Sequence, residues 1–552
     1  MSWAHARLRQ LLLLAAVGLG VSVTAFMDTL TRLASPTHIL IYHLSGSPFA
    51  FFVPAIADTI LLSAVCFTAL LSARPGTSLY RALWSFALCL YPWLLVRNSS
   101  AVFDMPFPRL ESYALLALCG AAFLFLALRR SNSADRAFFH VHSIGEAVLA
   151  AVGVIGALTL VEISILGVRA RHLNDQVVAD TITRPAQTAP HGRVVWILLD
   201  ELAYRQLYGH RLAGLQLPAF DQFRAQSTDF SNVHPAGIRT EVVLPALMTG
   251  DSVDKIQSTA SGALSIHDAA GWHSFDQQNT VFSDADAMGY HTSVVGWFNP
   301  YCRILPNVLD SCFWVNHSLL EGVSPDRGTV QNLLYPLHLL AEKLPSFFDI
   351  HKGLTAVDAE EGQEHIRDFV DLDRAADAAL SDRRNDFLFL HMPVPHPGGI
   401  WDRHTGQFAV GHSCYVDNLV LADDYLAHVK TLLEASGQWD STTVIIMGDH
   451  AWRTQLIWKG SPGWNDDDEL ASDGGRFDPR PAYLIKLPYQ HTGVTVQTPF
   501  DAVRTRSLMD QLLQGRFANP AQLQQWVAGD PSSDSVAAQT PRAIPPHKGD
   551  HS

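Results

Sequence analysis

Residues 193–200 read RVVWILLD, a continuous run of β-branched and apolar residues that ends in an aspartate. An unbroken run of this kind is typical of a strand buried on both faces of a sheet. NDFLFLHM at 385–392 and TTVIIMGD at 442–449 repeat the pattern, and helical patterns such as those at 280–290 and 419–437 lie between the runs. Buried strands that alternate with helices predict an α/β domain with helices on both faces of the sheet.

Five apolar runs precede this domain, near 10–29, 49–72, 79–96, 110–128 and 146–168. Most of them reach the roughly 20 residues that an α-helix needs to cross a bilayer. Because four more runs follow the first, we interpret the first as a membrane span and not as a cleaved signal peptide. The sequence therefore predicts an integral membrane domain of five helices at residues 1–168.

Positive charge sets the predicted orientation of these helices. Arginines gather at the N-terminus and in the second and fourth loops: Arg7, Arg9, Arg74, Arg81, Arg129, Arg130 and Arg136. The arginines of the first and third loops are fewer and are offset by acids. Because positively charged loops stay in the cytoplasm, we expect a cytoplasmic N-terminus and a periplasmic or extracellular domain after residue 168. The expected location is a bacterial-type inner (plasma) membrane.

Three segments follow the predicted membrane domain. Residues 169–190 are polar and contain two prolines, and we interpret them as a linker or interfacial segment. Residues 191–528 carry the α/β pattern, and residues 529–552 are rich in proline and serine and are predicted to be disordered. The net charge of −14 argues against a nucleic-acid partner, since no basic face would neutralise phosphates. The sequence does not indicate which oligomeric state the protein adopts.

Two cysteines of the outer domain lie close together in the sequence. Cys302 and Cys312 flank the stretch RILPNVLDS, and an outer compartment permits a disulfide between them. We expect this pair to be bonded, with Cys414 left over, although sequence alone does not fix the pairing.

Each apolar strand of the outer domain ends in reactive side chains. They are Asp200 and Glu201 at the first, His391 and His396 at the second, and Asp449 and His450 at the third. Taken singly, an acid after a strand is more often a turn or cap residue, but ligands of open α/β sheets bind outside the carboxyl ends of the strands. The coincidence of three such ends predicts a metal site. Mixed carboxylate and imidazole ligands suit Zn²⁺, with Mn²⁺ as the alternative.

The stretch GIRTEVVLPALMTG at 237–250 places Thr240 at the start of an apolar segment. Threonine at such a position is usually only a helix cap. Beside a metal, however, its hydroxyl can ionise and attack, and the positive end of a helix favours a tetrahedral phosphate there. We therefore predict Thr240 as a nucleophile, and we interpret Pro245 as part of a turn at the start of the helix and not of its interior.

These segments, in this order, resemble the alkaline phosphatase and sulfatase superfamily over about residues 191–490. ILLDELAYRQLYG, LPAFDQFRAQSTDFSNVHPAG, the Thr240 segment, FSDADAMGYHTSVVGW, FLFLHMPVPHPG, VIIMGDHAWR and DPRPAYLIKLP follow the family order. The resemblance implies a domain of alkaline-phosphatase/sulfatase type with a mixed central sheet. Preceded by five spans, the domain looks like the phosphoethanolamine transferases of lipopolysaccharide modification or the lipoteichoic acid synthases.

The resemblance also implies roles for individual residues. Asp200, Thr240, Asp449 and His450 would form the metal shell, and His396, with His391 as a second candidate, would contact the phosphoryl group or protonate the leaving alcohol. Further candidates for the site are Glu201, Asn299 and Arg239. In this branch a threonine takes the group from a phospholipid head, so the implied partners are a membrane lipid donor and an envelope glycan or lipid acceptor.

Departures from the family pattern narrow the expected chemistry. A formylglycine sulfatase needs Cys or Ser at the nucleophile position, where this chain has Thr240. The cationic Gly-Lys-Trp-His of sulfatases is replaced by residues 296–299, Gly-Trp-Phe-Asn. HMPVPHPGG lacks the acid of a second metal shell, which favours one metal. The transferases usually present Glu at the position of Asp200, so Glu201 remains a second candidate for the ligand.

Three functions remain open at this point. The first is transfer of a phosphoethanolamine- or phosphoglycerol-like headgroup from a phospholipid to an envelope acceptor. The second is hydrolysis of phosphate or sulfate esters by the same machinery, and the third is a non-catalytic envelope binding protein. Asp58 and Glu162 lie inside predicted spans, where acids either line a path for a lipid headgroup or are hydrated or paired near the interface.

Overall fold

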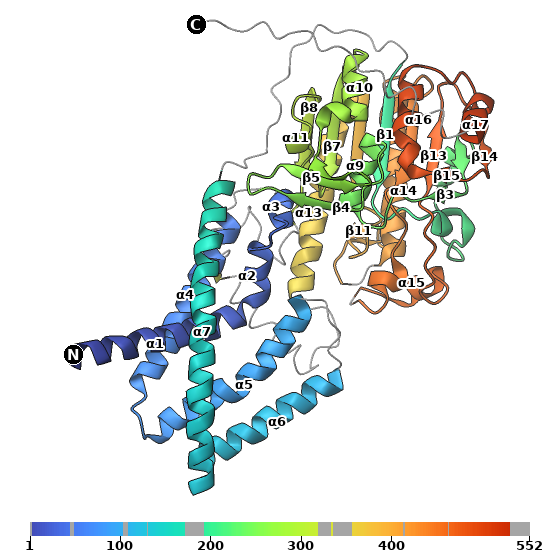
Figure 1. The fold of residues 1–552 in the computed structure, drawn as a ribbon. Coiled ribbons are helices and arrows are strands. Elements are labelled where there is room, and N and C mark those ends of the chain that lie inside the picture. Colours follow the sequence, from blue (N-terminus) through green and yellow to red (C-terminus); the bar gives the residue numbers. More distant parts are fainter. Residues whose placement is uncertain are drawn as a thin grey trace, which may run out of the picture.

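The computed structural model describes residues 3–44, 49–102, 109–129, 131–171, 192–317, 330, 333–334, 356–411, 414–461 and 463–529. A group of apolar helices is followed by an α/β domain (Figure 1). The predicted linker lies outside the described residues after residue 171, and the predicted tail lies outside them after residue 529.

Seven helices form the described N-terminal part: α1 (Trp3–Ala25), α2 (Met27–Leu33), α3 (Ile39–His43), α4 (Phe49–Ser72), α5 (Ser78–Val102), α6 (Arg109–Leu128) and α7 (Asn132–Ala170). Four of them, α1, α4, α5 and α7, contain stretches long and apolar enough to cross a membrane. The number is close to the five predicted. The apolar stretch of α6, Tyr113–Leu128, is shorter, because the helix begins with charged residues.

Helix α7 begins well before the predicted start at residue 146. The side chain of Ser131 accepts a hydrogen bond from the backbone N–H of Ala134 and so caps the helix at its N-terminus. Its 39 residues correspond to about 58 Å at 1.5 Å per residue, which exceeds the roughly 30 Å of a hydrocarbon core. The helix therefore extends beyond the span that hydropathy alone predicts.

Small residues bring α1 and α7 close together. A Cβ atom at Gly153 would lie 1.9 Å from the carbonyl oxygen of Ala16, and one at Gly20 would lie 2.1 Å from that of Leu149. Such close approach is how membrane helices gain packing contacts. Of the two acids predicted in the spans, Asp58 is buried in the bundle and Glu162 is exposed on α7.

The α/β domain has one eight-stranded mixed sheet in the described residues, in the order β14-β2-β13-β12-β1-β9-β7-β8. Its strands are β1 (Val194–Leu199), β2 (Thr228–Phe230), β7 (Thr292–Trp297), β8 (Ser311–Val315), β9 (Phe387–Met392), β12 (Thr443–Gly448), β13 (Tyr483–Lys486) and β14 (Val494–Val496). Strand β1 pairs in parallel with both β9 and β12, and β13 is antiparallel to β12. The three strands predicted from sequence thus lie side by side in the centre.

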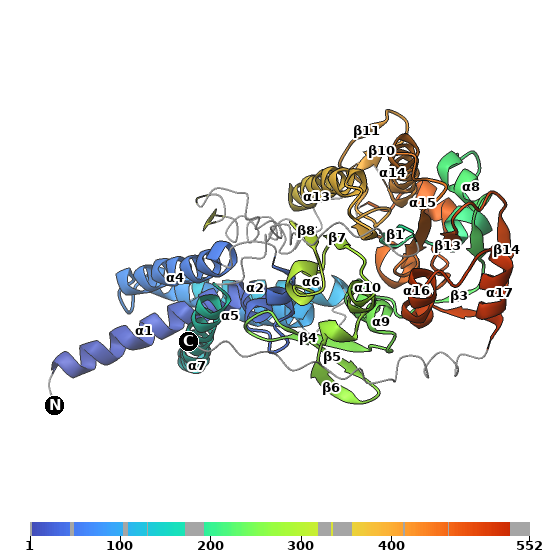
Figure 2. The same cartoon turned by 90° about the horizontal axis from the view of Figure 1, so that it is seen from above.

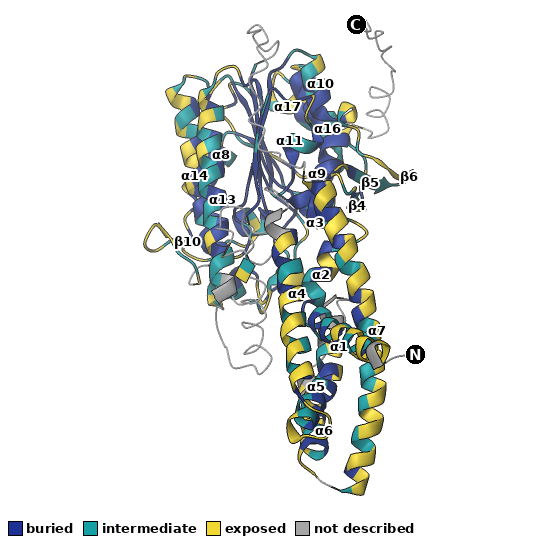
Figure 3. Cartoon of the chain, turned by 90° about the vertical axis from the view of Figure 1, so that its left-hand side faces the viewer, coloured by how far each residue is buried: buried dark blue, intermediate teal, exposed yellow. Residues whose placement is uncertain are grey.

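Helices cover both faces of this sheet (Figures 2 and 3). Alternate side chains of β1 enter two different hydrophobic clusters, with Trp196 and Leu198 on one face and Ile197 and Leu199 on the other. The first face packs against α9 (Thr240–Thr249), α10 (Val281–Ala287) and α16 (Thr505–Leu513). The second packs against α8 (Pro218–Arg224), α13 (Ala356–Ser381) and α14 (Tyr415–Ala435). Burial on both faces explains the unbroken apolar runs.

Smaller elements complete the domain. They are β3 (Val233–His234), β4 (Lys255–Ser258), β5 (Leu264–Asp268), β6 (Gly271–Ser274), β10 (Trp401–Asp402), β11 (Gln407–Phe408), β15 (Phe500–Asp501), α11 (Tyr301–Ile304), α15 (Asp466–Ala471) and α17 (Pro520–Ala528), with π-helical turns at Arg205–Gly209 and Thr454–Trp458 and 3-10 turns at Gln277–Asn279 and Ala502–Arg504. Cys302 of α11 and Cys312 of β8 form a disulfide in the structure, and Cys414 is a buried free thiol.

Candidate active site

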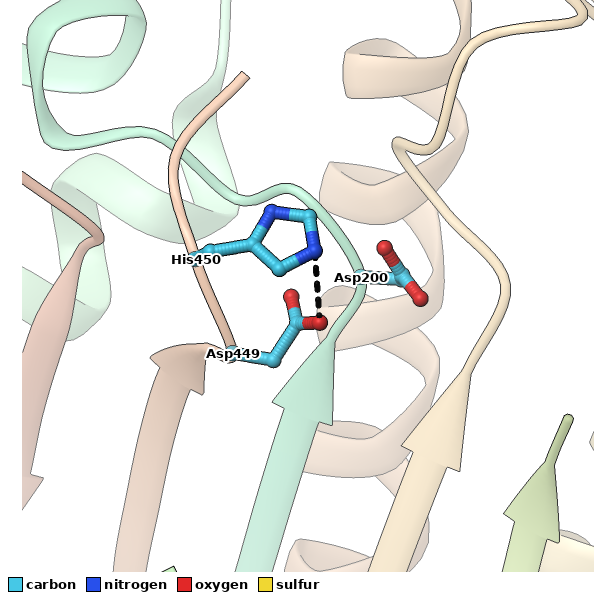
Figure 4. A group of neighbouring side chains, drawn as sticks. All are labelled: Asp200, Asp449 and His450. Carbon is cyan, nitrogen blue, oxygen red and sulfur yellow. Dashed lines mark ion pairs between the residues drawn. The ribbon is translucent and has the colours of Figure 1, made fainter. Parts of the chain in front are cut away.

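The reactive side chains at the strand ends converge on one point. Asp200 follows β1, and Asp449 and His450 follow the neighbouring strand β12. Figure 4 shows the three side chains beside one another above the strand ends, with the ring of His450 next to the carboxylate of Asp449. Each offers a ligand atom within 4.8 Å of the others, and all three are buried. This arrangement follows from the parallel pairing of β1 and β12, which brings their carboxyl ends to the same edge of the sheet.

Thr240, the first residue of helix α9, lies in the middle of this group. Its Oγ1 is 2.7 Å from Oδ2 of Asp449, 3.2 Å from Oδ2 of Asp200 and 3.3 Å from Nε2 of His450. A threonine hydroxyl has only one proton to donate, so most of the lone pairs that surround it have no proton to accept. Acceptors that converge in this way are what a bound cation requires.

The residues fit a divalent cation in further respects. Oδ1 of Asp200 is buried and has no hydrogen-bond partner within the described residues. Nδ1 of His450 is 3.1 Å from the carbonyl oxygen of Ala451. When Nδ1 donates its proton to that carbonyl, Nε2 keeps the lone pair that a metal ligand needs.

The charge of the two aspartates supports the same interpretation. Burial, and then the neighbouring charge of Asp449, raises the pKa of Asp200 well above its ordinary value. Burial also acts to raise the pKa of Asp449, but the imidazoles of His450 and His391 outweigh it, so this pKa is lowered. Two adjacent buried carboxylates repel each other when both are ionised. A dication between them would compensate both charges.

Glu201 is turned away from this cluster. Its backbone has a φ of +61°, and its carboxylate accepts hydrogen bonds from Nε of Arg453 at 2.7 Å, the backbone N–H of Arg453 at 3.1 Å and Nε1 of Trp458 at 3.0 Å. Asp200, Glu201 and His396 also lie within 4.8 Å of one another. Because the oxygens of Glu201 are already occupied by an ion pair, Asp200 is the better candidate for a metal ligand.

The two histidines at the second strand differ in position. His391 lies within β9 and is fully buried; its Nδ1 is 2.7 Å from the Tyr301 hydroxyl, and its Nε2 is 3.6 Å from Oδ2 of Asp200. His396 lies in the loop after β9, with Nδ1 2.8 Å from the carbonyl oxygen of Pro397. Burial, followed by the charge of Arg453, lowers the pKa of His396 well below its ordinary value. His396 is therefore neutral at physiological pH.

Not every candidate lies in the cluster. Arg239 precedes α9, but its side chain is half-exposed and lies 3.4 Å from Glu241 at the surface. Asn299 is buried and accepts a hydrogen bond from Tyr42. Pro245 lies inside α9, which corrects the prediction that it belongs to a turn at the start of the helix and not to its interior. The fixed φ of proline is compatible with a helix, and only the hydrogen bond to the carbonyl of Glu241 is lost.

Sequence reasoning missed several residues beside the cluster. Arg453 follows His450 in the quoted segment DHAWR, but only its ion pair with Glu201 shows what it does. A cavity of about 440 Å³ opens next to His396. Its lining is rich in aromatic side chains, among them Trp297, Trp452, Trp458 and Trp464. Only the abundance of tryptophan in the last third of the domain could have indicated this space.

Comparison with known proteins identifies the family. The model of the family described as Sulfatase matches residues 193–470, just over half of the chain. The chain therefore belongs to the sulfatase family, within the alkaline phosphatase and sulfatase superfamily. None of the curated proteins compared matches it. Members of this superfamily use a divalent metal. The family match together with the apolar N-terminal helices indicates a membrane-anchored enzyme that acts on esters.

Several solved structures are similar to part of this chain at low sequence identity. The lipoteichoic acid synthase LtaP from Listeria monocytogenes is 13% identical, covers 59% of this chain and 72% of its own, and has a TM-score of 0.33. The phosphonate monoester hydrolase of Agrobacterium radiobacter is 14% identical, with 58% and 74% covered and a TM-score of 0.35. A protein of the alkaline phosphatase superfamily from Vibrio parahaemolyticus is 14% identical, with 59% and 67% covered and a TM-score of 0.33.

Proposed function

We propose that this protein is a membrane-bound, metal-dependent phosphotransferase with Thr240 as its nucleophile. The donor would be a phospholipid, and the group moved would be its phosphoethanolamine- or phosphoglycerol-like head. The acceptor would be a glycan or lipid of the cell envelope, and the α/β domain would lie on the outer side of the membrane. The observation that carries the proposal is the convergence of Asp200, Asp449 and His450 on the hydroxyl of Thr240.

Asp200, Asp449 and His450, with Oγ1 of Thr240, would hold one divalent metal, for which zinc is the first choice and manganese the alternative. Such a metal lowers the pKa of a bound hydroxyl and stabilises the charge that develops on a transferring phosphoryl group. The chain's own contribution is to hold these four groups in place. Helix α9 starts at Thr240, so the positive end of its dipole faces the phosphate as well.

In the first step, Oγ1 of Thr240 attacks phosphorus and its proton passes to Oδ2 of Asp449, 2.7 Å away. The new Oγ1–P bond forms as the bond between phosphorus and the diacylglycerol oxygen breaks, and the leaving oxygen takes up a proton from water. In the second step, an acceptor hydroxyl attacks the phosphothreonine, and the Oγ1–P bond breaks. Oγ1 of Thr240 takes back the proton held by Asp449, and the proton of the acceptor hydroxyl passes through His396 to water.

His396 is placed to act in the second step. Because its Nδ1 donates to the carbonyl of Pro397, its Nε2 carries a lone pair; this atom lies 3.9 Å from Oε1 of Glu201, and the residue lines the aromatic cavity. A neutral imidazole with a free lone pair accepts a proton. We therefore assign His396 the role of removing the proton of the acceptor hydroxyl, in place of the expected protonation of the leaving alcohol.

The nucleophile segment separates this proposal from sulfatase chemistry. Thr240 cannot be converted to formylglycine, the nucleophile of sulfatases that use Cys or Ser at this position. A threonine alkoxide suits attack on a phosphodiester, and the metal group around it supplies the activation that an alcohol needs.

Product analysis tests the proposal. Full-length protein is incubated with vesicles that contain phosphatidylethanolamine or phosphatidylglycerol labelled in the head, together with an envelope lipid extract. The proposal expects diacylglycerol and a labelled acceptor in equal amounts with zinc, none with Thr240→Ala, and residual activity with Thr240→Ser, which keeps a hydroxyl. Free headgroup phosphate with no labelled acceptor would favour hydrolysis. No metal-dependent product at all would favour a binding protein.

A further inference from the structure

The segment between the first two membrane spans enters the α/β domain. Residues 37–44, which contain the short helix α3, lie beside β4 of that domain (Figure 1). Tyr42 is fully buried and belongs to the hydrophobic cluster that packs on α9. Its nearest sequence neighbours belong to the membrane domain, whereas its side chain lies in the core of the domain that carries the candidate active site.

Polar contacts fix this segment in place. The guanidinium of Arg303 donates to the carbonyl oxygens of Ile41, Tyr42 and Leu44, each at 2.9 Å. These carbonyls lie at the end of α3, where a helix leaves acceptors without partners of its own. Arg303 directly follows Cys302, which is bonded to Cys312, so its backbone is tied to β8.

Two further bonds hold the two ends of the segment. The backbone N–H of Ser258 donates to the carbonyl of Thr37 at 2.7 Å, and Nδ1 of His43 lies 2.9 Å from the carbonyl oxygen of Phe298. His43 is buried, and this burial lowers its pKa to about 4, so its ring is neutral and donates to Phe298 from Nδ1. The segment therefore binds the α/β domain along its whole length.

A chain of contacts leads from this segment to the metal cluster. The Tyr42 hydroxyl donates to Oδ1 of Asn299 at 3.2 Å, and the backbone N–H of Tyr301 donates to the carbonyl oxygen of Asn299 at 2.8 Å. The hydroxyl of Tyr301 is 2.7 Å from Nδ1 of His391. Nε2 of His391, in turn, lies 3.6 Å from Oδ2 of Asp200. Every member of the chain is buried.

We propose that residues 37–44 complete the active site and that Tyr42 is a positioning residue. Its hydroxyl orients Asn299 and Tyr301, which fix the ring of His391 beside the ligand Asp200. Partners of this kind behind metal ligands are known to set ligand orientation, and their loss typically costs about 10- to 100-fold in metal affinity or activity. The membrane domain is then more than an anchor, because one of its loops determines the geometry of the cluster. The inference rests on the proposed function for its activity readout.

Tyr42→Phe tests the inference in the full-length protein in detergent or vesicles, because it removes the hydroxyl and keeps the packed ring. We expect a kcat about tenfold lower with KM unchanged, and zinc affinity, measured by competition with a chelator, weakened by about tenfold. The unfolding temperature should change little. Ser35→Ala is the matched control, since Ser35 lies just before the segment and its exposed hydroxyl forms a hydrogen bond with that of Thr37; this variant should behave as wild type.

Arg303→Gln approaches the same interface from the other side. It removes the guanidinium that holds three carbonyls, so it should lower both kcat and the unfolding temperature, with the loss of kcat at least as large as in Tyr42→Phe. Wild-type kcat and zinc affinity in Tyr42→Phe would overturn the inference and leave the proposed function intact. A wild-type protein with neither bound zinc nor headgroup transfer would overturn the proposed function and, with it, this inference.

Discussion

Replacing Asp200 by asparagine is expected to have opposite effects on stability in the metal-free and the metal-loaded protein. In the metal-free protein, Asp200 is 1% exposed and its Oδ1 has no hydrogen-bond partner among the described residues. Burial, and then the charge of Asp449, raises the pKa of Asp200 well above its ordinary value, so ionising this carboxyl costs free energy in the folded protein. An unsatisfied buried polar group costs about 1–3 kcal/mol, and a charged one costs more.

Asp200→Asn removes this charge, so the free energy of unfolding of the metal-free protein should rise by about 1–3 kcal/mol. For a domain of about 340 residues, the unfolding entropy converts this change to a rise in Tm of about 1–4 °C. Metal-loaded protein should behave in the opposite way. Zinc at 100 times its Kd stabilises the wild type by about 2.7 kcal/mol, and most of that gain should be lost when a neutral amide replaces the carboxylate ligand.

The assay is thermal unfolding of the detergent-solubilised protein at pH 8, after chelation and again with excess zinc. Glu434→Gln is the control, since it also replaces an acid by an amide, but in an exposed pair with Lys430, where such pairs contribute little. An undiminished zinc-induced rise in Tm in Asp200→Asn would refute the ligand assignment. A lower Tm of the metal-free variant would refute the reasoning about the buried charge.

Three other predictions concern the surroundings of the site. Glu201→Gln should destabilise the fold by about 3–5 kcal/mol in denaturant unfolding, because it leaves Arg453 buried without its partner. Zinc affinity, measured by chelator competition, should stay nearly unchanged, and a large loss of this affinity would contradict the prediction. Burial raises the pKa of Asp468 to about 7, so the folded state keeps a proton that the unfolded chain loses near pH 4. The free energy of unfolding therefore falls by about 1.4 kcal/mol per pH unit as the pH rises between these two values. Asp468→Asn should therefore raise Tm relative to wild type at pH 8 and not at pH 4, and an equal shift at both would count against it. Changing both Cys302 and Cys312, which are ten residues apart, to serine should lower the free energy of unfolding by about 3 kcal/mol relative to the oxidised wild type. An equal loss of stability when the wild-type disulfide is reduced would support this prediction.

The strands and the metal cluster were predictable because both depend on local pattern. RVVWILLD and TTVIIMGD are buried on both faces, and their length and apolar character are sufficient to identify them. Parallel neighbours then place Asp200 and Asp449 at one edge. The start of helix α9 at Thr240 was visible in its own segment.

What sequence could not give are contacts between distant segments. Glu201 and Asp200 are adjacent acids, and the sequence favours neither as the metal ligand. Only the ion pair of Glu201 with Arg453, far along the chain, distinguishes the two candidates. Tyr42 lies in a loop between two apolar runs, and no local periodicity indicates that its ring enters a core 257 residues away at Asn299. The length of α7 was underestimated because its polar first turns carry no hydropathy signal.

The central claim is that the hydroxyl of Thr240 becomes bonded to phosphorus. The most direct measurement is peptide mass spectrometry of full-length protein, loaded with zinc, mixed with phosphatidylethanolamine vesicles and quenched in acid within the first turnovers. The account predicts that the peptide containing Thr240 gains the mass of a phosphoethanolamine group, and that the gain disappears when an acceptor is added or when zinc is removed. An unmodified Thr240 in a preparation that releases diacylglycerol would contradict it.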